Sequence, residues 1–322
     1  MRIASIDIGT NTILLLVGEI KDDQIIPLRE EFRIPRLGKS ISSTQMIEED
    51  SQLQLVQTLN EYKQIAQIYN VEKIICGGTA VFRKAKNSNE VIKKVLKETG
   101  ILINVLSSEQ EAVLTFLGGI SNFNEYYDKD FIVIDIGGGS TEITKGNLNT
   151  IEFLKSYNIG AVTLKDRFFN SYPYQTKIEE IYNYLDYIFT DELRTKNAVT
   201  ISVAGTPTTI ASIFLKQKVF EEKAVDKTYL MSTYLNHLIN EFYQLSPDQI
   251  SSKFPSVVKG REDVILPGTI LLKFIMDKFS IKGLYVSTRG IRYGMIILEA
   301  MNYGDGFWTN VGLRKLISSL FG

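Results

Sequence analysis

Asp135-Ile136-Gly137-Gly138-Gly139-Ser140-Thr141-Glu142 is the stretch of this sequence that decides the fold. It directly follows the apolar run Phe131-Ile132-Val133-Ile134, so it predicts a strand that turns through a glycine-rich tip. Successive glycines let backbone N–H groups converge on phosphate oxygens without interference from a Cβ atom, and Ser and Thr hydroxyls add donors. An ordinary hairpin turn is the alternative. Three glycines between carboxylates favour a phosphate-binding loop, with Gly137, Gly138, Gly139, Ser140 and Thr141 as its residues.

A looser copy of this pattern stands near the start of the chain, as Ser5-Ile6-Asp7-Ile8-Gly9-Thr10-Asn11-Thr12. Taken alone, its residues Gly9, Thr10, Asn11 and Thr12 fit a hairpin turn as well as a phosphate loop. The two copies are separated by about one domain length. The repeat therefore predicts two α/β domains, over residues 1–124 and 125–304, with the C-terminal helix 305–322 joined to the first.

Composition excludes several classes of chemistry. The 322 residues carry 36 Lys and Arg against 37 Asp and Glu, so no overall basic field indicates a nucleic-acid partner. One cysteine, Cys76, and one histidine, His237, exclude disulfides, Cys/His zinc sites and Ser-His-Asp triads. Cys76 in an apolar strand is expected in the core, and His237 on a helix surface. The absence of a signal peptide and of an apolar run of about 18 residues predicts a cytoplasmic protein without a membrane span.

Periodicity places further elements along the chain. It predicts strands over residues 24–28 and 101–106, an irregular segment over 31–39, and a helix over 46–69. A Thr-x-x-Glu capping box predicts that a helix starts at Thr176 with Glu179, and a short helix is expected over 310–321.

Two more strand ends carry candidate site residues. Arg83 follows the predicted strand 71–76 and the sequence Gly77-Gly78-Thr79, and Gly205-Thr206 follows the predicted strand 200–203. Open α/β sheets collect ligands at the carboxyl ends of their strands. Arg83 is thus either a guanidinium clamp on a phosphoryl group or a surface cation, and Gly205 and Thr206 are candidates for a third phosphate-binding loop.

Glu111 has two competing interpretations. Ser108-x-x-Glu111 matches a capping box, in which the glutamate bonds a backbone N–H at its own helix start, and the residue types alone favour this reading. The alternative is a general base, because the single histidine leaves carboxylates as the natural proton acceptors.

The carboxylates Asp135, Glu142 and Asp7 flank the two glycine loops. Aspartates are also common in surface turns. A carboxylate beside a phosphate would repel it unless a hard cation lay between them, and Mg²⁺ with its oxygen ligands meets that need. Asp135 is the strongest candidate ligand, followed by Glu142 and then Asp7.

These motifs together resemble a known family. The paired loops look like the two phosphate motifs of the acetate kinase, sugar kinase, Hsp70 and actin superfamily. The fuller set is similar to the exopolyphosphatase and guanosine pentaphosphate phosphohydrolase family in its short two-domain form, and it includes Arg36-Leu37-Gly38, Thr79-x-x-x-Arg83, Ser107-Ser108-Glu109-Gln110-Glu111-Ala112, Asn158-Ile159-Gly160-Ala161-Val162, Ala204-Gly205-Thr206 and Arg289-Gly290-Ile291-Arg292-Tyr293-Gly294. Thr288 departs from the family pattern, in which an acidic residue is common, and Gln110 stands where relatives often carry Glu.

The resemblance implies an α/β fold of two ribonuclease H-like (actin-like ATPase) domains facing a central cleft. It implies a hydrolase that removes terminal phosphate from inorganic polyphosphate or, alternatively, from guanosine pentaphosphate. Glu111 would orient and deprotonate the attacking water, Arg83 would grip the phosphoryl group, and Mg²⁺ or Mn²⁺ would be the cofactor. Arg33, Arg36, Lys39, Lys84 and Lys86 are expected to line the approach of a long polyanion.

Two other functions stay open on the sequence. A kinase of the same superfamily would transfer phosphate to an acceptor other than water, and a non-catalytic relative would bind a nucleotide without releasing phosphate. The 16 tyrosines and 17 phenylalanines leave room for a homodimer surface.

Overall fold

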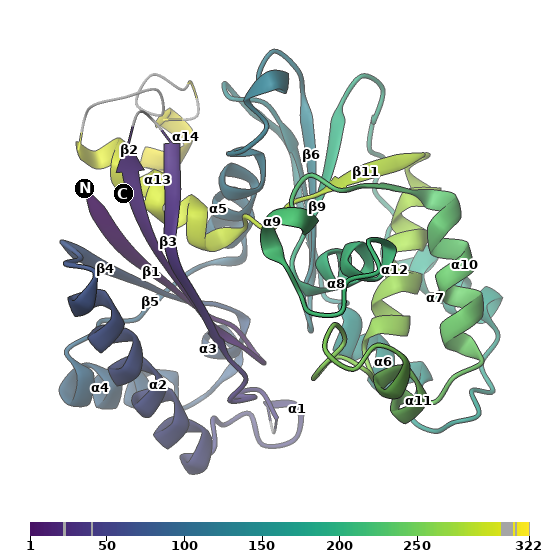
Figure 1. Ribbon diagram of the computed structural model, residues 1–322, viewed down its shortest axis with the longest axis horizontal. Coiled ribbons are helices and arrows are strands. Elements are labelled where there is room, and N and C mark those ends of the chain that lie inside the picture. Colours follow the sequence, from purple (N-terminus) through teal and green to yellow (C-terminus); the bar gives the residue numbers. More distant parts are fainter. Residues whose placement is uncertain (22–23, 40, 304–311, 313, 322) are drawn as a thin grey trace. The chain divides into compact units, whose positions relative to one another are not determined.

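The computed structural model describes residues 1–21, 24–39, 41–303, 312 and 314–321, and the chain divides into two compact units. Unit 1 consists of Met1–Gly118 together with the described residues from Ile291 on, and unit 2 is Gly119–Gly290. Each unit contains one mixed β-sheet with helices packed on it (Figure 1). The fold is therefore mixed α/β with one sheet in each unit, as the sequence predicts.

The sheet of unit 1 has the strand order β3-β2-β1-β4-β5. Its strands are β1 (Arg2–Ile8), β2 (Ile13–Lys21), β3 (Gln24–Arg33), β4 (Lys73–Gly78) and β5 (Asn104–Val105). Its helices are α1 (Ile41–Thr44), α2 (Glu49–Ile68), α3 (Ala80–Lys84), α4 (Ser88–Thr99), α5 (Ser108–Ile120), α13 (Ile291–Tyr303) and α14 (Arg314–Phe321). β1 pairs antiparallel with β2 and parallel with β4, so the ends of β1 and β4 meet at one edge of the sheet.

Two cores hold unit 1 together. Ala4, Ile6 and Ile8 of β1 pack with apolar side chains of α2 and α4, among them Leu59 and Val95. A smaller cluster joins α5 to α13 through Leu106, Leu114, Ile291 and Met295.

The sheet of unit 2 has the order β10-β11-β9-β6-β7-β8. Its strands are β6 (Phe131–Ile136), β7 (Thr141–Gly146), β8 (Ile151–Tyr157), β9 (Val199–Val203), β10 (Tyr229–Met231) and β11 (Gly283–Val286). Its helices are η1 (Asn124–Tyr126), α6 (Ala161–Phe168), α7 (Ile178–Ile188), α8 (Gly205–Phe214), α9 (Glu222–Val225), α10 (Ser232–Tyr243), α11 (Pro247–Lys253) and α12 (Ile265–Lys278). α12 is buried along most of its length and packs with α6, α8 and α10. It forms the middle of the unit 2 core.

The expected domain ranges, 1–124 and 125–304, differ from these units at both junctions. α13 belongs to unit 1 because it packs on β1 and β2. Gly294 of α13 approaches α5 so closely that an added Cβ would lie 1.9 Å from the carbonyl oxygen of Leu114. Residues 304–311 and 313 of the predicted C-terminal segment lie outside the described residues. α14 packs in unit 1, where Gln110 Nε2 donates to the carbonyl oxygen of Leu320 at 2.7 Å.

Several local predictions need correction. β3 continues to Arg33, beyond the predicted strand 24–28 and into the segment expected to be irregular, because Glu31 and Arg33 pair with β2. The predicted strand 101–106 pairs only at Asn104 and Val105. α7 starts at Ile178 rather than Thr176, and Lys177 at its N-cap makes no side-chain capping bond. The predicted helix 46–69 is confirmed as α2 with slightly shorter ends.

The two singular residues lie where the sequence places them. Cys76 is buried in the β4 core, and His237 lies on the exposed surface of α10 with 74% of its side chain accessible. No helix within the described ranges combines the length and apolar character that a membrane crossing requires.

Candidate functional site

The loop of residues 9–12 joins β1 to β2 and is closed by its own backbone. Gly9 N donates to the carbonyl oxygen of Thr12 at 2.9 Å. The chain after β3 braces the loop from outside, since Arg36 N donates to Asn11 O at 3.1 Å and Gly38 N to Thr10 O at 2.8 Å. These bonds occupy carbonyl oxygens of the loop, whereas the Thr10 and Thr12 hydroxyls bond to none of the described residues. The loop is thus a fixed turn with hydroxyls free for a ligand.

Arg83 and Glu111 form an ion pair beside this loop. Arg83 Nη1 lies 2.6 Å from Glu111 Oε2 and also donates to the carbonyl oxygen of Leu106 at 2.8 Å. Thr79, just before α3, donates through N and Oγ1 to Ile8 O, each at 3.1 Å, and so ties the start of the Arg83 segment to the end of β1. The structure therefore brings together two predicted catalytic residues that are 28 positions apart in sequence.

The capping interpretation of Glu111 is wrong. The capping box at the start of α5 uses the preceding pair: Ser107 N donates to Gln110 Oε1 at 2.8 Å, and Gln110 N donates to Ser107 Oγ at 3.0 Å. Gln110 therefore performs the capping role, and the Glu111 carboxylate is held by Arg83 instead. Burial raises the pKa of Glu111 above its ordinary value, and the neighbouring Arg83 guanidinium partly offsets that rise. A buried carboxylate with a raised pKa and one cationic partner fits a general base.

Asp7 lies at the end of β1, with its Oδ1 atom buried and without a hydrogen-bond partner among the described residues. Burial raises the pKa of Asp7 from 3.8 to about 7, the charge of Glu111 adds to the rise, and Arg292 of α13 opposes it. Arg292 is itself fixed, since Nη1 donates to Leu15 O at 2.9 Å and lies 2.8 Å from Glu30 Oε2. Asp7 and Glu111 thus form a close pair of buried acids in unit 1.

The chemistry of Asp7 fits a hard cation. Mg²⁺ keeps several waters and takes only one or two protein carboxylates beside substrate phosphates. An orphaned buried carboxylate oxygen next to a phosphate-type loop offers one such ligand. Among the described residues no three Asp, Glu, His or Cys side chains gather into a metal-binding group. A cation here would therefore depend on substrate and water for its remaining ligands.

The loop of residues 137–140 between β6 and β7 is held by the N-terminus of α6. Gly137 N donates to Ser140 O at 3.0 Å and closes the turn. Backbone N–H groups of α6 donate to the loop: Ala161 to Gly137 O at 2.9 Å, and Val162 and Thr163 to Gly138 O at 2.9 and 3.1 Å. With these carbonyl groups turned toward α6, the loop is fixed in one conformation.

Gly160 makes that contact possible. A Cβ at Gly160 would lie 2.5 Å from Gly137 O and 2.6 Å from Gly138 O. Thr141 is also fixed behind the loop, because its Oγ1 donates to Ile159 O at 2.7 Å and the residue is fully buried. Thr141 therefore anchors the loop, and its hydroxyl is already used within the protein.

Asp135 and Glu142 are direct cross-strand partners on β6 and β7. Glu142 is only 4% exposed and accepts a hydrogen bond from Ser156 Oγ on β8 at 2.6 Å. Asp135 is half-buried at the end of β6 that leads into the glycine loop. The structure thus places these two predicted ligands side by side in unit 2.

The loop before α8 lies next to the loop of residues 137–140, because β9 runs parallel to β6. Ala204 has φ 75°, a left-handed conformation that a non-glycine residue rarely adopts. Thr206 is buried against α12, where a Cβ on Gly268 would lie 2.5 Å from Thr206 Oγ1. Gly205 is required for a different contact, since its Cβ would lie 2.1 Å from Nη1 of Arg261.

Arg261 is a residue that sequence reasoning missed. Its guanidinium lies over Gly205, and its one side-chain hydrogen bond among the described residues goes to Thr209 Oγ1 at 3.2 Å. No described carboxylate lies within ion-pair distance, and burial lowers the pKa of the guanidinium. A cation inside an otherwise apolar approach to α12 was the available signal, but only the fold shows that it reaches Gly205.

Comparisons with known proteins agree with this geometry. The model of the Ppx/GppA phosphatase family matches residues 16–302. The bifunctional 3-dehydroquinate synthase/phosphatase of Fusobacterium nucleatum is 34% identical over 308 residues, which are 91% of this chain and 46% of that protein. Exopolyphosphatase 1 of Mycobacterium bovis is 25% identical over 321 residues, 95% of this chain and 90% of the relative.

Among solved structures, the Ppx/GppA family member of Aquifex aeolicus matches with a TM-score of 0.85 at 27% identity. The match covers 95% of this chain and 99% of that one. The chain thus spans about half the length of the Fusobacterium relative, and nearly the whole length of the mycobacterial and Aquifex proteins.

Proposed function

Because this chain belongs to the Ppx/GppA phosphatase family, we propose that it is a phosphoanhydride hydrolase that releases terminal orthophosphate from inorganic polyphosphate. The observation that carries the proposal is the buried Arg83–Glu111 pair, in which Glu111 is freed from helix capping by Gln110. The name exopolyphosphatase belongs to the mycobacterial relative and supports this choice of substrate.

The proposed reaction is an in-line attack of water on the terminal phosphorus. Glu111 accepts a proton from the water as the new P–O bond forms and the bridging P–O bond breaks, and the electron pair leaves on the shortened chain. The raised pKa of Glu111 suits it to hold that proton near neutral pH. Arg83 uses Nη1 for Glu111 and Leu106, which leaves the other guanidinium nitrogens for phosphoryl oxygens.

Each unit supplies donors for substrate phosphates in this proposal. Unit 1 offers the Thr10 and Thr12 hydroxyls of its loop. Unit 2 offers the loop of residues 137–140, the backbone at Gly205 and Thr206, and the Arg261 guanidinium, which has no described acidic partner. Gly139 and Ser140 are the parts of the glycine loop farthest from its anchor on α6.

A divalent cation, Mg²⁺ or Mn²⁺, is the proposed cofactor. It would neutralise charge on the phosphoryl oxygens. Asp7 is the proposed carboxylate ligand in unit 1, and Asp135 and Glu142 are the proposed ligands in unit 2. In unit 1, a cation would also stabilise the ionised form of Asp7, which burial otherwise disfavours.

Phosphate release measured side by side from polyphosphate, guanosine pentaphosphate and ATP, with and without Mg²⁺, tests this function. We expect Mg²⁺-dependent release that is fastest from polyphosphate. Faster release from guanosine pentaphosphate would make it the preferred substrate instead. ATP consumption only in the presence of a sugar or carboxylic acid acceptor would show a kinase, and ligand binding without any release would show a non-catalytic protein.

A further inference from the structure

A group of exposed cations surrounds the loop of residues 9–12 in unit 1, and we call it the basic rim: Arg36, Lys39, Lys84 and Lys86. We propose that the basic rim binds phosphates of a linear polyphosphate chain beyond the phosphoryl group that is cleaved, and so makes the enzyme favour long chains. This inference rests on the proposed function. It assigns the reading of chain length to a definite surface of unit 1.

Backbone hydrogen bonds place the basic rim beside the loop. Arg36 N donates to Asn11 O at 3.1 Å, and the segment that carries Lys84 and Lys86 begins at Thr79, whose N donates to Ile8 O at 3.1 Å. Lys86 N in turn donates to the carbonyl oxygen of Gln45 at 2.8 Å, which joins the two cation-bearing segments. α1 and α3 lie at the same end of unit 1 (Figure 1).

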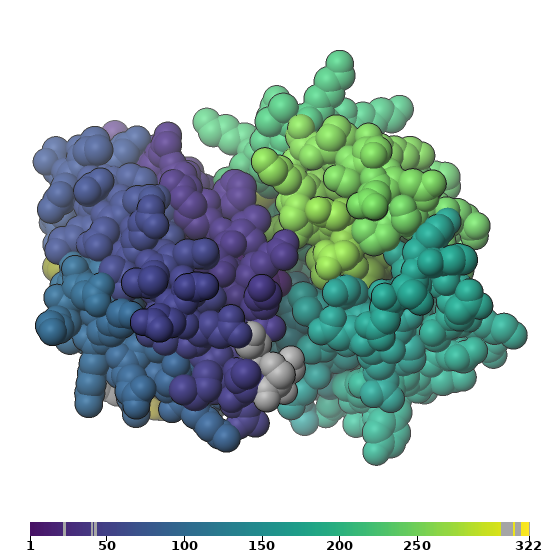
Figure 2. Space-filling model, turned by 90° about the horizontal axis from the view of Figure 1, so that it is seen from below, coloured from purple at the N-terminus to yellow at the C-terminus, as the bar shows by residue number. Residues whose placement is uncertain are grey.

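A second tie reinforces this join. Ile47 N donates to Asn87 Oδ1 at 3.0 Å, and Asn87 Nδ2 donates to Ile47 O at 2.9 Å, both buried. The chain that follows β3 lies at the surface in the view from below (Figure 2). The basic rim is therefore an exposed edge on a hydrogen-bonded frame.

The cations of the basic rim have no acidic partners. Residues 32–47 and 73–89 contain no Asp or Glu at all, so neither segment can neutralise its own charges. Within the described part of the chain, none of the four side chains forms an ion pair. Exposed, unpaired cations that share one edge produce a positive potential that attracts a polyanion.

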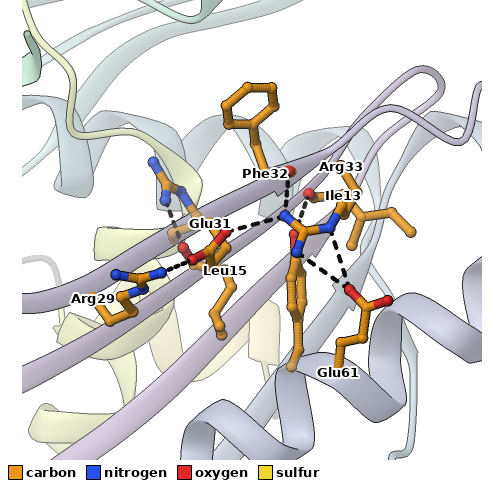
Figure 3. A network of polar contacts seen from close by, with 9 residues as sticks. Ile13, Leu15, Arg29, Glu31, Phe32, Arg33 and Glu61 are labelled. Atoms are coloured by element: carbon orange, nitrogen blue, oxygen red, sulfur yellow. Dashed lines mark hydrogen bonds and ion pairs between the residues drawn. The ribbon is translucent and has the colours of Figure 1, made fainter.

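Arg33 differs from these four, although the sequence places it in the same basic segment. Its Nη1 lies 3.0 Å from Glu31 Oε2 and its Nη2 lies 3.2 Å from Glu61 Oε2 (Figure 3). Arg29 on the same strand also pairs with Glu31. Arg33 is thus neutralised by acids of β3 and α2 and does not belong to the basic rim.

Chain length is the property that such a rim can read. An exposed ion pair contributes little on its own and is screened by salt. A long polyphosphate carries a charge on every phosphate, so one bound chain can contact several cations at once and gain from each. A substrate of three phosphates held at the loop of residues 9–12 offers few phosphates to the rim.

The triple variant Lys39→Gln/Lys84→Gln/Lys86→Gln tests the inference in the full chain. We expect KM for long-chain polyphosphate to rise about five- to tenfold, from the loss of three exposed ion contacts. We expect kcat on long chains, and both constants on tripolyphosphate, to stay within about twofold, because the variant leaves Glu111 and Arg83 in place. The dependence of the long-chain KM on salt should become shallower.

The matched control is Lys93→Gln/Lys94→Gln/Lys97→Gln on α4, which removes three lysines from the same unit and should leave the long-chain KM unchanged. An equal rise in KM for tripolyphosphate, an equal rise in the control, or no rise at all would overturn the role of the rim. So would an oligonucleotide that displaces polyphosphate from the wild type but not from the rim variant. Absence of phosphate release by the wild type from every substrate would refute the proposed function instead.

Discussion

At the scale of single residues, the chemistry of unit 1 depends on which neighbouring glutamate faces inward. Glu111 is held by Arg83 with 15% of its side chain exposed, whereas Glu109, two positions earlier on α5, is exposed. Gln110 between them caps the helix. Three consecutive polar residues thus have three different roles, and their side-chain directions decide them.

Glu111→Gln is expected to lower kcat by about 10²- to 10⁴-fold, the range of general acid–base contributions, with little change in KM. Glutamine keeps the size of the side chain but cannot accept the proton. Glu109→Gln is the control and should keep wild-type kinetics. Steady-state phosphate release, with a thermal melt of each variant, checks this, and equal activity of the two variants would refute the base assignment.

Asp7→Asn should change how stability depends on pH. Burial raises the pKa of Asp7 from 3.8 to about 7, so between these pH values the folded protein holds a proton that the unfolded chain has lost. Stability from this group is therefore fully present at low pH and falls as pH rises toward 7. The variant lacks that loss, so it should match the wild type near pH 4 and exceed it above pH 7, by up to about 4 kcal/mol.

Urea unfolding without divalent cations, from pH 4 to pH 8, measures this difference. Asp50→Asn, at an exposed position of α2, is the control and should follow the wild type closely. A constant stability gap between Asp7→Asn and the wild type at all pH values would contradict the assignment. Added Mg²⁺ should stabilise the wild type at pH 8 more than Asp7→Asn, because it favours the ionised carboxylate.

At the scale of elements, the glycine loop of unit 2 owes its conformation to α6. The first N–H groups of α6 bond to Gly137 and Gly138, and these bonds exist only because Gly160 has no side chain. A helix N-terminus usually has free donors for an anion. Here those donors are used to fix the loop, so a phosphate must be bound by the loop itself.

Gly160→Ala is expected to displace the glycine loop, because the new Cβ would lie 2.5 Å from Gly137 O. Overpacking of this kind costs about 1–3 kcal/mol, and a shift of about 1 Å at a reacting site can cost up to about 100-fold in rate. We therefore expect a lower melting temperature and at least a tenfold loss of kcat/KM. Gly290→Ala, where an added Cβ meets no atom within 4 Å, is the control; comparable damage from it would show that the effect is not specific to the α6 contact.

At the scale of the whole molecule, the chain enters unit 1, builds unit 2 as one continuous segment and then returns. Unit 2 is Gly119–Gly290, whereas unit 1 needs α13 from the far end of the sequence. α13 contributes Ile291 and Met295 to the cluster with Leu106 and Leu114, and Arg292 pairs with Glu30. The two units therefore differ in whether a continuous fragment contains all their core.

A fragment of residues 119–290 should fold alone with a cooperative thermal transition, while residues 1–118 alone should not. The reason is that the shorter fragment leaves the α13-facing side of its sheet uncovered. Joining residues 1–118 through a short Gly/Ser linker to residues 291–322 should restore a cooperative transition. Circular dichroism melts of the three proteins check this, and cooperative folding of residues 1–118 alone would contradict it.

The sequence predicted the parts of the site that depend on local order. Both glycine loops, the strands before them and the position of Arg83 after a strand follow from short stretches of chain, and the structure has them. The start of α5 was displaced by one residue, since Ser107 rather than Ser108 begins the capping box. Local pattern alone could not separate these two serines, because either spacing is followed by a residue that can cap.

What the sequence by itself determined is the two-fold repeat of strand, glycine loop and strand, and with it the α/β class and the family resemblance, because these features rest on neighbours in the chain. Only the tertiary structure decided that Glu111 pairs with Arg83, that Arg33 is neutralised by Glu61, and that Arg261 reaches Gly205. It also decided that α13 belongs to unit 1. Each of these depends on contacts between distant segments, and burial and charge at those contacts set the roles of the side chains.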